Sequence, residues 1–141
     1  MQRGRRVAFD YGDARIGVAV SDSDGILASP LTTLRSTDKK LKNKLLELFQ
    51  EFEPIKIYLG KPSNMDGTSG SAVEKSLEFR ELLLTLTNSP IELIDERLST
   101  VSGARSLRDS GIRSKESKSR IDEAAAVAIL EFALSIEKNR T

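Results

Sequence analysis

The chain has 141 residues, the usual length of a single domain, and can bury a hydrophobic core without disulfides or a structural metal. It has no cysteine and no histidine, which excludes disulfide frameworks, thiol nucleophiles, imidazole bases and metals bound through Cys or His. Lysine and arginine number 22 against 21 aspartates and glutamates, so the net charge of +1 does not by itself attract a polyanion. Catalysis would have to use carboxylates, hydroxyls, lysines, backbone groups or a hard cation held by oxygen ligands.

Apolar periodicity predicts secondary-structure elements in the order β-β-β-α-β-α-β-α-α. In chain order these are strands over 7–9, 16–20 and 26–34, a helix over 38–52, a strand over 55–59, a helix over 71–86, a strand over 91–94, and helices over 100–109 and 121–138. Residues 61–70 are expected to form a polar loop and 110–119 a mobile one, because large apolar side chains are scarce there.

This order predicts an α/β fold in one domain that covers residues 1–141. Three early strands at hairpin spacing favour an antiparallel half, and the later alternation of strands and helices favours parallel βαβ units. The third strand contains Pro30 and is therefore expected at an edge or with an irregularity. A mixed five-stranded sheet with helices on both faces satisfies these requirements.

Acidic residues follow two of the predicted strands and open the last helix. Asp10 ends the first strand, Asp95 and Glu96 end the fifth, and Asp122 and Glu123 begin the last helix. Ligands of α/β sheets gather at the carboxyl ends of parallel strands, so acids from these three places are expected to meet if the first and fifth strands run in the same direction near the sheet centre. Spacing alone decides neither between Asp95 and Glu96 nor between Asp122 and Glu123.

Three converging carboxylates repel one another unless they take up a proton or share a cation. Mg²⁺ or Mn²⁺ fits best, because both ions accept carboxylate oxygen and water, and the chain has no softer ligand. Such ions activate a water molecule and stabilise a leaving alkoxide at phosphorus, so the expected reaction is phosphodiester hydrolysis. The alternative is that each acid only solvates a strand end or caps a helix.

Four segments of the chain resemble one known family. They are DYGDARIGVAVSD at 10–22, GKPSNMDGTSG at 60–70, DERLST at 95–100 and IDEAAAVAIL at 121–130. In this order they resemble the YqgF family of ribonuclease H-like proteins, which are related to Holliday-junction resolvases and regarded as nucleases that mature the 5′ end of pre-16S rRNA. The resemblance implies a ribonuclease H-like fold. It also places the catalytic, metal-binding acids on Asp10, Glu96 and Asp122.

Several polar and basic residues near these segments are candidates for contact with substrate phosphates. The candidates are Arg15, Asn64, Arg97, Arg113, Lys115, Lys118 and Arg120. Residues 105–120 contain six basic residues against two acidic ones, and 35–44 contain five against one. The first window adjoins Asp122 and is favoured for phosphate contact, while the second is more typical of a solvated face.

The leading hypothesis is a Mg²⁺- or Mn²⁺-dependent nuclease in the cytoplasm that processes pre-16S rRNA. The expected partners are nucleic acid and the ribosome, without a membrane, and the protein is expected to be a monomer or a homodimer. Three alternatives remain open from the sequence: a Holliday-junction resolvase acting on branched DNA, a non-catalytic ribosome-associated factor, and an ATPase of the actin or sugar-kinase type. The last usually requires two lobes, and the chain has room for one.

Overall fold

The computed structural model describes residues 1–61, 71–96 and 115–140, with the backbone alone over 115–119. Its elements are β1 (Arg6–Tyr11), β2 (Arg15–Ser21), β3 (Ala28–Arg35), α1 (Leu41–Phe52), β4 (Lys56–Lys61), α2 (Ser71–Leu86), β5 (Ile91–Asp95) and α4 (Lys115–Arg140). The helix expected over 100–109 lies outside the described residues. No described helix combines the length and apolar character needed to cross a membrane.

The strands form one mixed sheet in the order β3-β2-β1-β4-β5. β1 pairs antiparallel with β2, and β2 with β3, whereas β1 pairs parallel with β4, and β4 with β5. The predicted antiparallel and parallel halves are therefore confirmed, with β1 at the centre. β5 is an edge strand, so the expectation that the first and fifth strands both lie near the centre holds only for β1.

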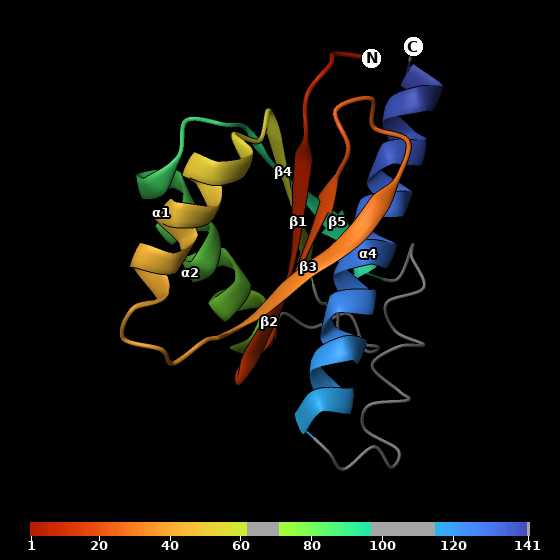
Figure 1. The fold of residues 1–141 in the computed structure, drawn as a ribbon. Coiled ribbons are helices and arrows are strands. Elements are labelled where there is room, and N and C mark those ends of the chain that lie inside the picture. Colours follow the sequence, from red (N-terminus) through yellow and green to blue (C-terminus); the bar gives the residue numbers. More distant parts are fainter. Residues whose placement is uncertain (62–70, 97–114, 141) are drawn as a thin grey trace.

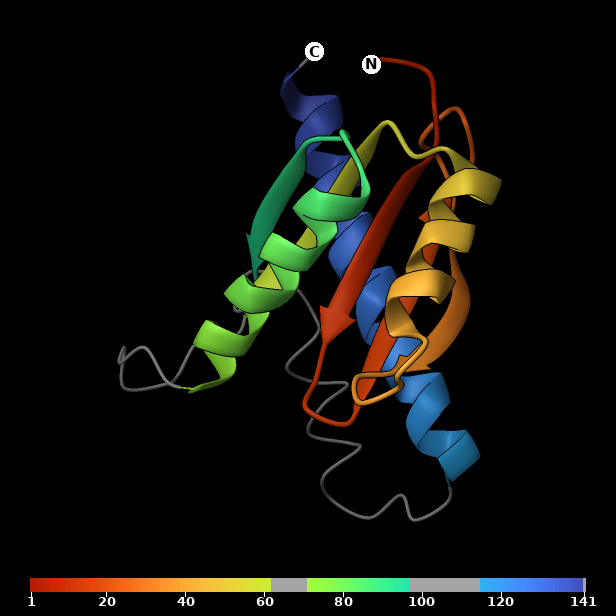
Figure 2. The same ribbon diagram turned by 90° about the vertical axis from the view of Figure 1, so that its left-hand side faces the viewer.

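Helices cover both faces of the sheet: α1 and α2 lie on one side and α4 on the other (Figures 1 and 2). Alternation along β1 explains this division, because Val7 and Phe9 face α1 and α2 while Ala8 faces α4. The layer between the sheet and α4 is built largely from small side chains, which let the helix approach closely. These are Ala8, Ala19, Ala125, Ala126 and Ala133.

Most predicted elements differ from the structure by one to three residues at an end, and the third strand and the last helix show why. The third strand runs from Ala28 to Arg35, and its register shifts beside Pro30, which confirms an irregular edge strand. The last helix begins at Lys115, so the loop expected over 110–119 is wrong for 115–119. These residues lack the apolar spacing by which an amphipathic helix is recognised, but lysine and glutamate have high helix propensity.

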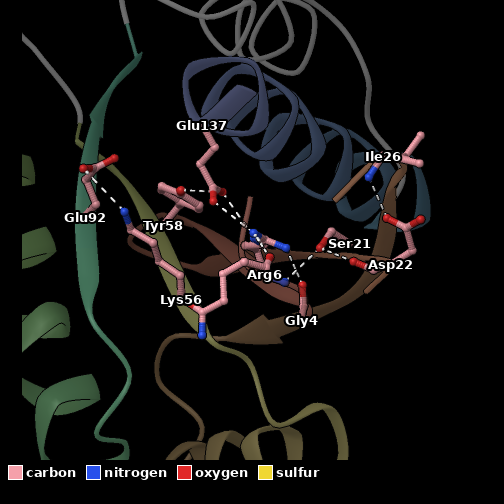
Figure 3. A network of polar contacts seen from close by, with 10 residues as sticks. Gly4, Arg6, Ser21, Asp22, Ile26, Lys56, Tyr58, Glu92 and Glu137 are labelled. Atoms are coloured by element: carbon pink, nitrogen blue, oxygen red, sulfur yellow. Dashed lines mark hydrogen bonds and ion pairs between the residues drawn. The ribbon is translucent and has the colours of Figure 1, made fainter. Parts of the chain in front are cut away.

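A buried polar network fastens the end of α4 to the start of the sheet (Figure 3). Arg6 is fully buried and donates to both carboxylate oxygens of Glu137, at 3.2 and 3.1 Å. The Tyr58 hydroxyl donates to the same carboxylate at 2.7 Å. Burial, together with this bond to Glu137, raises the pKa of Tyr58. The network lies near both chain termini, at the end of the sheet where β1 begins (Figures 1 and 2).

Candidate active site

Asp10 lies near the carboxyl end of the central strand β1, on the face covered by α4. It follows Phe9, which faces the other layer, and shares its own side of the strand with Ala8. Its cross-strand neighbour in β2 is Gly17. The carboxylate is only 2% exposed, so a charged group lies under α4 where a core side chain would otherwise stand.

Gly17 brings Asp122 against the strand that neighbours Asp10. A Cβ at Gly17 would lie 2.0 Å from the backbone oxygen of Asp122, a distance that no real Cβ adopts. Glycine therefore allows the helix backbone to approach β2 at this point. Asp122 is 1% exposed, and the packing places it beside the strand pair that carries Asp10.

Gly60 has the corresponding role on the other side of β1. It stands in β4 one residue beyond Leu59, which pairs with Phe9. A Cβ at Gly60 would lie 3.0 Å from the Oε1 atom of Glu96, so the Glu96 side chain reaches from the end of β5 over β4 toward β1. Glu96 is 6% exposed. Two glycines, one in each strand beside Asp10, thus adjoin the other two acids.

Arg15 forms an ion pair with Asp122. Its Nε atom donates to Oδ2 of Asp122 at 2.7 Å, and the arginine side chain is 26% exposed. The sequence makes Arg15 a candidate for contact with substrate phosphates. The structure identifies Asp122 as the acid that it neutralises, across 107 positions of the chain. Asp13 instead pairs with Lys75 at the surface.

The donor set suits a hard divalent cation. Three carboxylates lie buried at the same end of the sheet, and the glycines beside Asp10 let the other two acids pack close to its strand. In the part of the chain that the structure describes, no three acidic side chains are grouped as ligands of one ion, and Arg15 occupies one oxygen of Asp122. A shared metal site formed by Asp10, Glu96 and Asp122 therefore remains a proposal.

The other predicted contact residues are placed only in part. Asn64, Arg97 and Arg113 lie outside the described residues, and Lys115 and Lys118 are placed by their backbone in the first turns of α4. Arg120 is exposed, two positions before Asp122.

One contact of the site was missed in the sequence, and one expectation about its glycines is confirmed. Thr33 donates to Glu123 at 2.9 Å, which ties the helix to the edge strand and separates Glu123 in role from its neighbour Asp122. The sequence indicates either positive φ or close backbone approach for Gly12 and Gly17, and the structure confirms close approach at both, without positive φ. The signal for Gly17 was present, because glycine inside a strand often marks such an approach.

Comparison with known proteins identifies the family. Residues 4–136 match the family described as RuvX: Holliday junction resolvase. A protein of Streptomyces avermitilis is 46% identical over 140 residues, which cover 98% of this chain and 90% of that protein. A protein of Streptomyces coelicolor is also 46% identical over 140 residues, covering 98% and 84%. Both relatives carry the provisional name pre-16S rRNA nuclease.

Solved structures agree on the fold. RuvC of Thermus thermophilus in complex with a Holliday junction substrate superposes with a TM-score of 0.61 at 14% identity, covering 96% of both chains. A second RuvC structure from Thermus thermophilus gives a TM-score of 0.57 at 13% identity, again covering 96% of both. The family match, the relatives and the ribonuclease H-like sheet lead to one conclusion: this chain belongs to the RuvX family of Holliday-junction-resolvase-like nucleases.

Proposed function

We propose that this protein is a divalent-metal-dependent nuclease that hydrolyses phosphodiester bonds at the 5′ end of pre-16S rRNA in the cytoplasm. The observation that carries the proposal is the burial of Asp10, Glu96 and Asp122 at one end of one sheet face, where two glycines in the strands beside Asp10 let the α4 backbone and the Glu96 side chain pack close to it. Fully buried carboxylates without catalytic or structural use are rare, because burial disfavours the charged form.

Asp10, Glu96 and Asp122 would hold Mg²⁺ or Mn²⁺, and a bound ion supplies positive charge that activates water and stabilises the leaving alkoxide. In the proposed reaction the water oxygen forms a bond to phosphorus, and the bond from phosphorus to the leaving sugar oxygen breaks. The water loses a proton and the leaving oxygen gains one. Glu96, the acid on a long side chain at the sheet edge, orients the attacking water, while Asp10 is held rigidly in the central strand.

Arg15 has two uses in this scheme. In the structure its guanidinium neutralises Asp122. Because a quarter of the side chain is exposed, the remaining guanidinium nitrogens can also meet a substrate phosphate at the mouth of the site. A cation bound to Asp10, Glu96 and Asp122 would weaken the ion pair between Arg15 and Asp122, and would thereby favour the contact of Arg15 with phosphate.

Pre-16S rRNA is proposed as the substrate because the provisional name of the Streptomyces relatives specifies it, and they match nearly the whole chain at 46% identity. Branched DNA is the second candidate, favoured by the family description and by the RuvC structure bound to a Holliday junction. The likeness to RuvC at 14% identity supports the fold, so it does not decide between the two substrates.

The test compares cleavage of a 5′-labelled pre-16S rRNA leader and of a four-way DNA junction, each with Mg²⁺, Mn²⁺ or EDTA. Asp10→Asn is expected to lower cleavage at least about a hundredfold, since it removes one negative charge and keeps the side chain's shape. Asp13→Asn is the matched control: it lies in the same hairpin, is exposed and should cleave like the wild type.

Two further pairs test the choice of acids. Glu96→Gln is compared with Asp95→Asn, and Asp122→Asn with Glu123→Gln. The proposal expects the first member of each pair to lose activity and the second to keep it. Undiminished cleavage by Asp10→Asn would overturn the assignment, and binding without cleavage under every divalent ion would favour a non-catalytic ribosome-associated factor.

A further inference from the structure

An exposed group of basic side chains lies at the end of the molecule that holds the candidate active site. We name it the basic edge and define it by Arg35, Lys39, Lys40 and Lys42, at the end of β3 and the start of α1. β1 ends, β2 begins and β3 ends at this same end of the sheet. Both ribbon views show the β1–β2 turn beside the loop that leads into α1, with α4 starting nearby (Figures 1 and 2).

Hydrogen bonds hold the loop of the basic edge against the hairpin that follows Asp10. The backbone N–H of Ser36 donates to the oxygen of Ala14 at 3.0 Å, and the Ser36 hydroxyl donates to the oxygen of Gly12 at 2.5 Å. The basic edge is therefore attached to the turn that connects Asp10 to Arg15, and its position relative to the acids is determined by backbone contacts.

The four side chains of the basic edge differ from most of the other described cations in their lack of acidic partners. Most of the other lysines and arginines whose side chains the structure describes form ion pairs: Arg3 with Asp24, Arg6 with Glu137, Lys44 with Asp38, Lys56 and Arg140 with Glu92, Lys75 with Asp13, and Arg80 with Glu81. Among the side chains that the structure describes, no carboxylate lies within ion-pair distance of Arg35, Lys39, Lys40 or Lys42. The nearby Asp38 is engaged by Lys44, which lowers the pKa of Asp38.

Like charges also face each other where the basic edge meets the site. Arg15 and Arg35 are direct cross-strand partners in β2 and β3 and share one face of the sheet. Like charges in this position destabilise a strand pair, and the carboxylate that compensates Arg15 is Asp122, not an acid beside Arg35. An external anion between the basic edge and Arg15 would relieve this repulsion.

We propose that the basic edge binds the phosphate backbone of the nucleic acid substrate on its way to the acids. The proposal rests on the proposed function, because it takes a nucleic acid as the substrate. Compact exposed ammonium groups and a free guanidinium suit phosphate oxygens without reading base sequence. The net charge of +1 does not indicate this basic surface, because the acidic residues that balance its charge lie elsewhere on the molecule.

The test measures binding in EDTA, so that cleavage cannot affect it, with a fluorescein-labelled RNA hairpin and a labelled four-way DNA junction. The variant is K39Q/K40Q/K42Q, which removes three exposed charges; Lys40 makes no side-chain cap to α1, so the helix should form normally. The control is R3Q/K138Q/R140Q, which removes the same charge near the chain termini, at the opposite end of the sheet.

The variant should bind about tenfold more weakly at 100 mM salt. The logarithm of its association constant should depend less steeply on the logarithm of the salt concentration, with a slope smaller in magnitude by about 2, because each lost phosphate contact contributes roughly 0.7–0.9. The control should change affinity by less than about twofold. Equal weakening of both triple variants, or none in K39Q/K40Q/K42Q, would overturn the proposal.

The outcomes separate this proposal from the proposed function. If the wild type cleaves but K39Q/K40Q/K42Q binds normally, only the basic edge is refuted. If the variant loses binding and the wild type cleaves nothing with any divalent ion, the basic edge stands and the nuclease assignment fails. Weakening on both probes supports a surface for phosphate backbones in general, while weakening on one identifies RNA or DNA as the bound partner.

Discussion

Asp122 shows how a buried carboxylate is accommodated at this site. Its Oδ2 atom accepts from Arg15 at 2.7 Å, and the acid is almost fully buried while the arginine remains partly exposed. Removing one partner of such a pair leaves the other charge without compensation in a poorly solvated place. The stability of the fold and the electrostatics of the candidate site are therefore coupled through these two side chains.

Replacement of the guanidinium should show this coupling. Arg15→Gln is expected to lower the free energy of unfolding by about 2 kcal/mol, less than for a fully buried pair because Arg15 is partly exposed to water. Urea denaturation at neutral pH measures the change, with Arg80→Gln as a control on an exposed pair. Equal stability of Arg15→Gln and the wild type would show that solvent already compensates Asp122.

The two glycines beside Asp10 should differ in their tolerance of a methyl group. A Cβ at Gly17 would collide with the Asp122 backbone, whereas a Cβ at Gly60 would meet the ends of the Ile129 and Glu96 side chains, which can move. Gly17→Ala should therefore cost about 3 kcal/mol and Gly60→Ala about 1 kcal/mol. Denaturant titration of both variants tests the ranking, and a smaller loss in Gly17→Ala would contradict the close approach of α4.

Helix α4 connects the two ends of the molecule. Asp122 near its start belongs to the candidate site, and Glu137 near its end accepts from Arg6 and Tyr58 (Figure 3). The helix packs along β1, β2 and β3 between these points. The network at Glu137 therefore stabilises α4, the helix that places Asp122 beside Gly17.

Loss of the Glu137 charge should loosen this attachment. Glu137→Gln leaves the fully buried Arg6 guanidinium without its carboxylate and should cost about 3 kcal/mol in the free energy of unfolding. Glu131→Gln, on an exposed position of the same helix, should change stability by less than about 0.5 kcal/mol. Thermal unfolding of both variants provides the measurement; equal melting temperatures would refute the role of the network.

The same network predicts a pH dependence. The folded protein holds the Tyr58 proton more tightly than the unfolded chain, because burial and Glu137 raise the pKa of its hydroxyl. The resulting stability is complete below the ordinary tyrosine pKa of about 10 and is lost as pH rises above that value. Tyr58→Phe should flatten this alkaline loss in urea titrations, whereas an unchanged slope would show that Tyr58 ionises normally.

For the whole molecule, binding of a divalent ion should appear as added stability. A ligand that binds only the folded state at ten times its dissociation constant contributes about 1.4 kcal/mol. The melting temperature of the wild type should therefore rise with Mn²⁺ or Mg²⁺, and that of Asp10→Asn should not. Asp13→Asn, with its exposed acid, should keep the full rise. An identical rise in all three proteins would show that the ion binds elsewhere.

Local patterns predicted most elements of the fold. Apolar periodicity and the hairpin spacing of the early segments led to strands that the structure confirms. The start of α4 at Lys115 was not predictable in this way, because residues 115–119 lack the apolar spacing by which an amphipathic helix is recognised. The edge position of β5 depends on how the crossover helices pack, which strand periodicity does not record.

Asp10 and Glu96 stand near strand ends, which are local features, and the family resemblance selected Glu96 and Asp122 from their acidic neighbours. The expectation that Asp122 begins the last helix was wrong, because α4 begins at Lys115. The surroundings of these acids were not recognisable in the same way. Arg15 meets Asp122, Gly17 admits the helix backbone, and Gly60 lies under Glu96 only after α4 and β5 dock on the central strands. The sequence by itself determines which short segments form strands and helices and where the acids stand along them. The tertiary structure decides which charged groups meet. Those contacts join segments far apart in the sequence, and they depend on how closely α4 packs on the sheet.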